Sequence, residues 1–234
     1  MFVDIHSHVL PGLDDGARNL EESLKLLRIL KRQRVDAVVA TPHFYDGKEK
    51  FEDYLARRRT AYDAVKERLT EDMPELFLGC EVKYFRGISN IPEMQKLRIG
   101  NSGYILLELP YRMMTAAEID EIREFKYSIG LTPILAHIDR YMRFSGFSRI
   151  LDLLKSGEAL AQINAERLDR IKKRHRVNKL IGLGVISFLG SDTHSVKYRP
   201  PEITAFFERV DKKSKASLIK DIEYNSKIIY DEMK

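Results

Sequence analysis

Short apolar runs rich in β-branched residues recur along the chain and predict parallel β-strands. Most of them are too short and too uniformly apolar for amphipathic helices, and they are typical of strands that are covered on both faces. The predicted strands are residues 2–5, 35–40, 76–78 leading to Val82, 104–107, 133–136, 160–163 and 185–189.

Helical patterns lie between these runs. In the clearest one, leucines repeat every three to four residues from Leu20 to Leu30, with Asn19 as the N-cap and Glu22 three residues later. The other predicted helices are residues 51–69, 116–129, 147–155, 175–183 and 214–233. Alternating strands and helices predict an α/β fold with a parallel sheet, and seven strands favour a distorted, closed or nearly closed (β/α) barrel. Without a repeat or composition break, we expect one domain over residues 1–234.

Composition narrows the functional classes. Hydrophobic residues make up 44% of the 234 residues, which is enough for a core and argues against disorder. A single cysteine excludes a disulfide framework and suggests a reducing compartment. No signal peptide or membrane span is predicted, so we expect a cytoplasmic protein. The net charge of +5 is too small to indicate nucleic-acid binding.

Polar side chains gather where the predicted strands end, which is where barrels of this type assemble their active sites. In chain order they are His6, His8, Asp15, His43, Glu81, Glu108, His137, Asn164, Asp192 and His194. His6 and His8 are two residues apart on a strand and therefore point to the same face. Imidazoles joined by carboxylates predict a transition-metal site. His175 lies in the basic run 172–176, which we expect to be a solvated helix face.

These residues resemble the motifs of the polymerase-and-histidinol-phosphatase (PHP) superfamily. Within it, the segments 4–16, 41–43, 136–141 and 191–200 are most similar to the manganese-dependent protein-tyrosine phosphatases of bacterial capsule and exopolysaccharide loci. Two positions depart from that pattern: Ile138-Asp139 replaces Pro-Glu, and Thr193 replaces alanine. Neither is an expected ligand, but Asp139 adjoins Arg140 and bears on substrate preference.

The resemblance implies a distorted seven-stranded barrel that holds three divalent ions, with manganese expected first and iron or zinc as alternatives. It assigns His6, His8, Glu81 and Asp192 to the first ion; Glu81, Glu108 and His137 to the second; and Asp15, His43 and His194 to the third. It also implies that Arg140 and Arg199 grip the phosphate.

Phosphate monoesters hydrolyse very slowly unaided, and clustered metals bind their oxygens and activate water. We therefore expect in-line attack by a metal-activated hydroxide without a phosphoenzyme. Arginine forks match two phosphate oxygens, which suits Arg140 and Arg199. Asp15 or His194 is a candidate proton donor to the leaving group, although a metal ligand is poorly suited to that role.

A cysteine mechanism is one alternative, because Cys80 and Arg86 have the Cys-x5-Arg spacing of thiol-dependent tyrosine phosphatases. The residues between them include no glycine that would let backbone amides wrap a phosphate. Glu81 would also raise the pKa of the thiol. The sequence disfavours this alternative.

Three further alternatives stay open. A histidinol phosphatase would carry the same metal ligands, a nuclease would act on DNA 3′ ends, and a metal-binding regulator would use the barrel without catalysis. The basic runs 57–59 and 172–176 lack interleaved aromatics and favour solvated faces over nucleic-acid binding.

The resemblance implies a tyrosine-phosphorylated protein as substrate, namely the tyrosine-rich C-terminal tail of a membrane-associated autokinase. We expect no membrane insertion of the phosphatase itself. An oligomer is possible, because the sequence leaves open whether helix 214–233 packs on its own barrel or on a neighbouring subunit.

Overall fold

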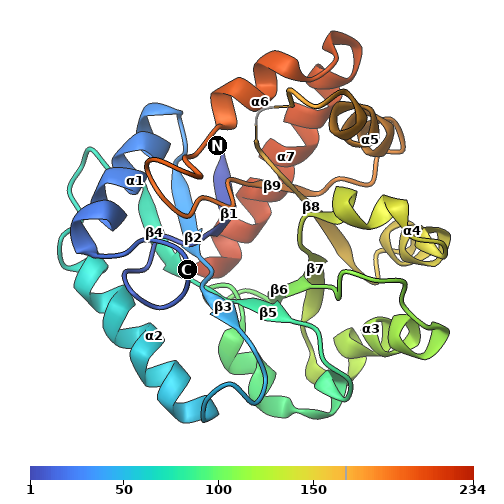
Figure 1. Cartoon of the computed structure of the whole chain (residues 1–234), viewed down its shortest axis with the longest axis horizontal. Helices are drawn as coiled ribbons and strands as arrows, with labels where there is room; N and C mark the ends of the chain where they lie inside the picture. Colours follow the sequence, from blue (N-terminus) through green and yellow to red (C-terminus); the bar gives the residue numbers. More distant parts are fainter. Residues whose placement is uncertain (167) are drawn as a thin grey trace.

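The computed structural model describes residues 1–166 and 168–234, with only the backbone for 213 and 214, and its strands curl into a barrel wall ringed by helices (Figure 1). The strands are β1 (Val3–Ser7), β2 (Ala37–Ala40), β3 (His43–Phe44), β4 (Glu75–Leu78), β5 (Glu81–Lys83), β6 (Tyr104–Glu108), β7 (Thr132–Leu135), β8 (Leu160–Asn164) and β9 (Phe188–Gly190). The α-helices are α1 (Leu20–Arg32), α2 (Phe51–Lys66), α3 (Ala116–Ile129), α4 (Phe147–Ser156), α5 (Ile171–Gly182), α6 (Ile203–Arg209) and α7 (Lys212–Met233). Short 3-10 helices are η1 (Ile88–Asn90), η2 (Pro92–Leu97) and η3 (Ile138–Arg143).

The strands pair in parallel, in the orders β1-β2-β4 and β3-β5-β6-β7-β8-β9. The chain leaves regular pairing after β2 and re-enters as β3, and it does the same between β4 and β5. Pro42, which has no N–H to donate, stands in the first break, and Gly79 opens the second. The expected α/β barrel is confirmed, but regular pairing divides it into two sheets instead of one seven-stranded ring.

The barrel closes where its first and last strands meet. The N–H of His8 donates to the Thr193 carbonyl at 2.9 Å, and the N–H of Asp192 donates to the His6 carbonyl at 2.8 Å. Residues that are distant in sequence therefore lie together at the barrel mouth.

Helix boundaries follow the expected capping chemistry in most places. The Asn19 side chain accepts from the N–H of Glu22, as its position predicts, and Thr115 with Glu118 forms a capping box before α3. The expected helix start at His175 is wrong, because α5 begins at Ile171 and so includes the whole basic run. The short α6 was not predicted.

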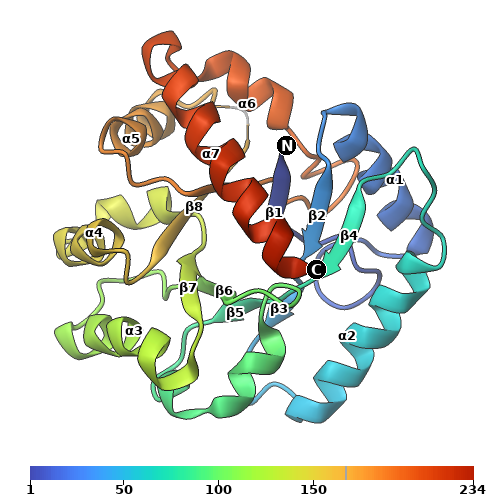
Figure 2. The same ribbon diagram turned by 180° about the vertical axis from the view of Figure 1, so that it is seen from behind.

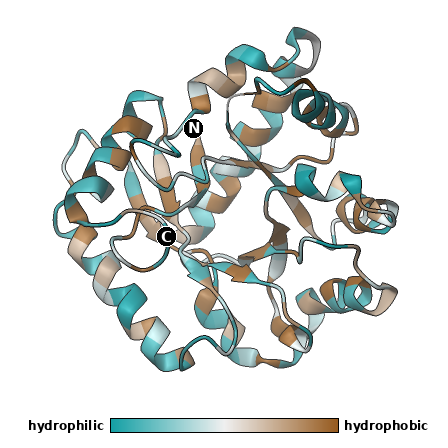
Figure 3. Ribbon diagram, viewed as in Figure 1, coloured by the Kyte–Doolittle hydropathy of each residue, from teal (hydrophilic) through white to brown (hydrophobic). Residues whose placement is uncertain are grey.

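Helix α7 crosses the end of the barrel opposite the mouth, as Figure 2 shows from behind. Its Ile229 and Met233 are buried in one cluster with Val3, Ile5 and Phe188. This answers the question that the sequence left open, because the helix packs on its own barrel. Hydrophobic residues concentrate on the strands and hydrophilic ones on the outer helix faces (Figure 3). Among the described residues, no helix has the length and apolar character of a bilayer span.

Two glycines allow the backbone to pass close to the histidines of β1. A Cβ on Gly190 would lie 2.4 Å from the His6 Cβ, and one on Gly16 would lie 2.2 Å from the His8 carbonyl oxygen. Real Cβ atoms do not approach so closely, so both positions require glycine. That residues 1–234 form a single domain stays a prediction.

We predict that Gly190→Ala lowers the free energy of unfolding by about 1–3 kcal/mol, because the added methyl group overpacks the site beneath His6. Urea unfolding at equilibrium measures this change. Gly182→Ala is the matched control, since its Cβ would meet nothing within 4 Å at the end of α5. That control should stay within about 1 kcal/mol of the parent protein. Equal unfolding midpoints for both variants would contradict the prediction.

Candidate metal centre

The structure brings every residue of the expected ligand set together at the barrel mouth. The side chains come from strands β1, β3, β5 and β6 and from the segments that follow β1, β7 and β9. Three groups of ligand atoms, each within 4.8 Å of one another, are His6, His8 and Glu81; His43, Glu81 and Glu108; and His8, Asp15, His43 and His194.

The first group gathers around Glu81, which is 1% exposed. Its Oε2 lies 3.2 Å from the His6 Nε2 and 3.3 Å from the His8 Nε2. The Asp192 Oδ1 lies 3.6 and 3.5 Å from the same two nitrogens. This set matches the four residues that the resemblance assigned to the first ion.

The set that the resemblance assigned to the second ion, His137 with Glu81 and Glu108, uses the other oxygen of Glu81. His137 Nε2 lies 3.1 Å from the Glu81 Oε1 and 3.7 Å from the Glu108 Oε1. The Lys83 ammonium also pairs with Glu108, at 2.9 Å. Glu81 is therefore placed to bridge two groups, whereas Glu108 is shared with a lysine that the sequence did not implicate.

The third group is the most open one. The Asp15 Oδ1 lies 3.5 Å from the His43 Nε2 and 3.4 Å from the His194 Nε2, and its side chain is 69% exposed. His8 joins this group, because its ring centroid lies 4.0 Å from that of His194. The resemblance had placed His8 with the first ion only, and the geometry puts it between the first and third groups.

Buried polar atoms without partners indicate what this mouth accommodates. The Glu81 Oε2, the His43 Nδ1 and the His137 Nδ1 are buried and have no hydrogen-bond partner among the described residues. The first two lie 3.0 Å apart without hydrogen-bond geometry. Unpartnered buried groups are costly, and cations bound between these N and O atoms would satisfy Glu81 and His43. The residues present therefore fit a cluster of divalent ions.

Electrostatics couples the acids to the imidazoles. Burial disfavours the charged form of Glu81, but the His6 charge and the hydrogen bond with His137 outweigh it and hold the Glu81 pKa well below its usual range. Burial likewise opposes protonation of His6, but Glu81 and Asp192 raise its pKa. The buried acids and the imidazoles of His6 and His8 thus favour each other's charged forms.

Arg140 and Arg199 both reach the centre. Each donates to the Asp192 Oδ2, at 3.1 Å from Arg140 and 2.7 Å from Arg199. Arg199 also approaches the His194 Nε2 at 3.0 Å. Two guanidinium groups therefore converge on one edge of the ligand cluster, as expected for a phosphate grip.

Two residues of the centre have strained backbones. His137 has φ of 36° and Asp192 has φ of 49°, in the left-handed region that non-glycine residues rarely adopt. Such strain persists where the surroundings fix it, and it clusters at functional sites. Here it turns both side chains into the mouth.

Three residues orient the expected ligands: Asn164, which the sequence placed at the mouth without a role, and Asp14 and Gln162, which it did not single out. The Asp14 Oδ2 accepts from the His8 Nδ1 at 2.8 Å and from the backbone N–H of His43 at 2.9 Å. The Gln162 Oε1 accepts the N–H of His137 at 2.7 Å, and the Asn164 amide donates to Asp192 at 2.5 Å. Carboxylates and amides behind metal ligands commonly fix their tautomer and direction. The pair Asp14-Asp15 offered a signal for the first contact, but nothing in the sequence marked Gln162.

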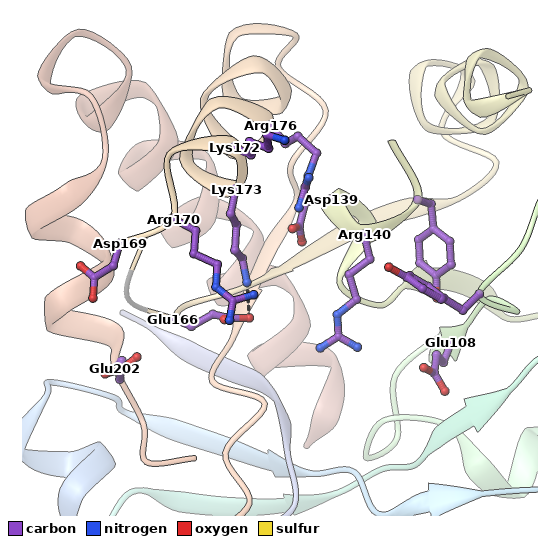
Figure 4. Close-up of a pocket in the computed structure, with 12 residues that line it drawn as sticks. Glu108, Asp139, Arg140, Glu166, Asp169, Arg170, Lys172, Lys173, Arg176 and Glu202 are labelled. Carbon is purple, nitrogen blue, oxygen red and sulfur yellow. Dashed lines mark ion pairs between the residues drawn. The ribbon is translucent and has the colours of Figure 1, made fainter. Parts of the chain in front are cut away.

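A cavity of about 1110 Å³ opens beside the centre. Figure 4 shows the Arg140 guanidinium pointing into the space between Glu166 and Glu108, while Lys173 reaches Glu166 in an ion pair. Lys172, Lys173 and Arg176 of α5 line the cavity. The prediction that 172–176 is a solvated face is confirmed for Lys172 and His175, which are exposed, whereas Lys173 and Arg176 are half-buried at the cavity wall.

The thiol alternative finds no support in the structure. Cys80 is fully buried and lies 3.0 Å from the Tyr54 hydroxyl, and burial raises its thiol pKa to about 12. A reactive cysteine needs a low pKa and access to substrate. Cys80 has neither property.

Comparison with known proteins places this centre in context. A family model described as capsular polysaccharide synthesis, CpsB/CapC, matches residues 2–230. The chain is 30% identical over 203 residues to the tyrosine-protein phosphatase YwqE of Bacillus subtilis, covering 84% of this chain and 79% of that protein. It is 30% identical over 216 residues to the tyrosine-protein phosphatase CpsB of Streptococcus agalactiae, covering 85% of each.

Solved structures agree with this relation. A structure from work on YwqE of B. subtilis and CpsB of Streptococcus pneumoniae, described as metal-dependent tyrosine phosphatases, matches with a TM-score of 0.78 and 25% identity. The match covers 96% of this chain and 94% of that one. A proposed histidinol phosphatase from Listeria monocytogenes has a TM-score of 0.53 at 13% identity, covering 83% and 96%, and shows a shared fold only.

We predict that Asp14→Asn weakens metal affinity about 10–100-fold, because His8 loses the carboxylate that orients its ring. Metal titration followed by elemental analysis measures the change. Asp46→Asn is the control, since Asp46 is exposed in the turn after β3. Unchanged metal content in the Asp14 variant would show that this contact does not orient a ligand.

We also predict that manganese binding near pH 7 releases protons, because His6 and His8 must be neutral to coordinate. Burial opposes their protonation, but neighbouring carboxylates raise the pKa of both, so the metal-free protein holds more protons than the loaded one. Metal affinity should therefore increase as the pH rises. Calorimetry in buffers of different ionisation enthalpy counts the protons, and zero release would contradict the prediction.

Proposed function

The chain belongs to the CpsB/CapC family of capsular polysaccharide synthesis, and from this premise we propose that it is a metal-dependent protein-tyrosine phosphatase. The observation that carries the proposal is the position of Glu81. Its two oxygens face different imidazole groups within one ligand cluster, beside two arginines that converge on Asp192.

The metal content that we propose is three divalent ions, manganese first. His6, His8, Glu81 and Asp192 would hold one; Glu81, Glu108 and His137 a second; and Asp15, His43 and His194 a third. When bound, such ions polarise the phosphoryl oxygens and lower the pKa of a coordinated water. The Asp14, Gln162 and Asn164 contacts keep the ligands in place for this.

The arginines supply the second part of the mechanism. Arg140 and Arg199 present planar donors that match two phosphate oxygens and fix the orientation of the ester for in-line attack. Their present contacts with Asp192 keep both guanidinium groups directed at the centre. Charge that develops on the phosphoryl oxygens would meet donors that are already in position.

The leaving tyrosine oxygen needs little help, because a phenolate is a fairly good leaving group. The His194 Nδ1 lies 2.9 Å from the Asp192 carbonyl oxygen, so it carries the proton and leaves the Nε2 lone pair facing Asp15. Burial lowers the His194 pKa to about 4. A neutral imidazole with this tautomer suits a ligand better than a donor, which argues against His194 as the proton donor.

The physiological substrate that we propose is a tyrosine-phosphorylated protein, namely the tail of a membrane-associated kinase that controls capsule or exopolysaccharide synthesis. The open cavity beside Arg140 offers room for a peptide. We propose that the enzyme acts in the cytoplasm. Histidinol phosphate is the alternative substrate, and only a shared fold speaks for it.

We predict that EDTA abolishes hydrolysis of a phosphotyrosine peptide and that added Mn²⁺ restores it, because the ligand cluster needs its ions. The peptide should be turned over with a higher kcat/KM than histidinol phosphate. Arg140→Gln should lower kcat/KM about 10–100-fold through the loss of one charge-assisted contact. Steady-state kinetics on both substrates measures these effects.

Two controls make the outcome decisive. Arg149→Gln changes an exposed arginine of α4 and should leave the kinetics intact. Cys80→Ser should retain activity. A higher kcat/KM for histidinol phosphate would favour that alternative substrate. Absence of any phosphatase activity would favour a metal-binding regulator. Loss of activity in the cysteine variant would contradict the metal mechanism.

A further inference from the structure

Arg58 of α2 is a buried cation without a counter-ion. It is 6% exposed, and its guanidinium donates to the Gly79 carbonyl at 3.2 Å and to the Lys96 carbonyl at 2.7 Å. These carbonyls and the Tyr54 ring, whose centroid lies 5.8 Å from the guanidinium carbon, offer partial negative charge but no counter-ion. Its Nε is buried with no hydrogen-bond partner, and no carboxylate of the described residues pairs with it. The expectation that 57–59 is a solvated run is thus wrong at Arg58.

The uncompensated charge borders a second cavity, of about 570 Å³. This cavity lies between α2, η2 and the end of α7, beside β4, the outer strand of the three-stranded sheet. Its lining includes Arg58, Arg59, Lys96 and Arg98 and contains no aspartate or glutamate. It shares no lining residue with the cavity beside Arg140.

Partners outside the cavity neutralise only two of these cations. Arg59 pairs with Asp63 at 2.8 Å, and Lys96 pairs with Glu52 at 3.0 Å. In the part of the chain that the structure describes, neither Arg58 nor Arg98 has a carboxylate within ion-pair distance. Arg58 and Arg98, which both line this cavity, therefore carry positive charge without a carboxylate partner there.

A buried charge is strongly destabilising unless an opposite charge or a ligand compensates it. Each amino group of a guanidinium carries two N–H donors, so two arginines that line one cavity match the oxygens of a tetrahedral anion. We propose that this cavity is a second anion site, which binds inorganic phosphate or the phosphate group of a small molecule through Arg58 and Arg98. The site adjoins the strand break at Gly79, two residues before Glu81, and is separate from the catalytic phosphate grip.

The test counts phosphate bound to the manganese-loaded protein by equilibrium dialysis with radiolabelled inorganic phosphate. The wild type should bind two phosphates per chain, one at the metal centre and one here. Arg98→Gln should weaken the second event about tenfold or more through the loss of a charge-assisted contact, while phosphotyrosine hydrolysis persists. The double variant Arg140→Gln, Arg199→Gln should keep the second event.

The matched control is Arg57→Gln, which changes a neighbouring exposed arginine that does not line the cavity. It should bind phosphate as the wild type does. Arg58→Gln serves as a further variant if circular dichroism shows that it folds. A binding curve that is unchanged in Arg98→Gln, or lost entirely in the Arg140 and Arg199 variant, would overturn the proposal. Phosphate binding at the second site is measured independently of hydrolysis. A failure of the proposed phosphatase activity can therefore be told apart from a failure of the second site.

Discussion

The structure depends on keeping a carboxylate charged in the interior of the barrel. Glu81 lies where imidazoles from β1, β3 and the end of β7 converge, and Asp192 faces two of the same rings from the other side. Burying such groups costs several kcal/mol each unless opposite charges compensate them. The strand order provides opposite charges by bringing the imidazoles next to the carboxylates. The same imidazoles and carboxylates would form a set of metal ligands once cations replace the imidazole protons.

The two strand breaks let His43 and Glu81 reach the barrel mouth. Helix α2 donates hydrogen bonds to backbone carbonyls that the breaks leave without a strand partner. The Pro42 carbonyl in the first break accepts from the Tyr54 hydroxyl at 3.1 Å. The Gly79 carbonyl in the second break accepts from Arg58, one helical turn further along α2. One face of α2 therefore supplies hydrogen bonds to the backbone at both strand breaks. Tyr54 and Arg58 are the two buried polar residues that donate them.

The sequence predicted the ligands better than it predicted their supports. Histidines and acids at strand ends can be recognised in the sequence as candidate ligands. The alternation of side chains along a strand and the parallel barrel topology bring residues such as His6, His8 and Glu81 to the same end of the barrel. The role of Gln162 depends on the distance between two strands, which no local pattern encodes. Arg58 and Lys173 looked like members of solvated basic runs because charge runs do not reveal which side chain turns inward. The short α6 and the breaks in the strands were decided by tertiary packing.

Closure of the barrel joins residues that are far apart along the chain. The N–H of Ser191 donates to Asp4 at 2.8 Å across 187 positions, and Val3 donates to Ser226 at the same seam. Contacts of this separation form late in folding, because their loop entropy must be overcome first. His6 and His8 lie on one side of the seam and Asp192 and His194 on the other, so an ion held between them acts as a clasp. Cations bound there would stabilise the closed barrel, so the metal-free protein should unfold more readily than the loaded one.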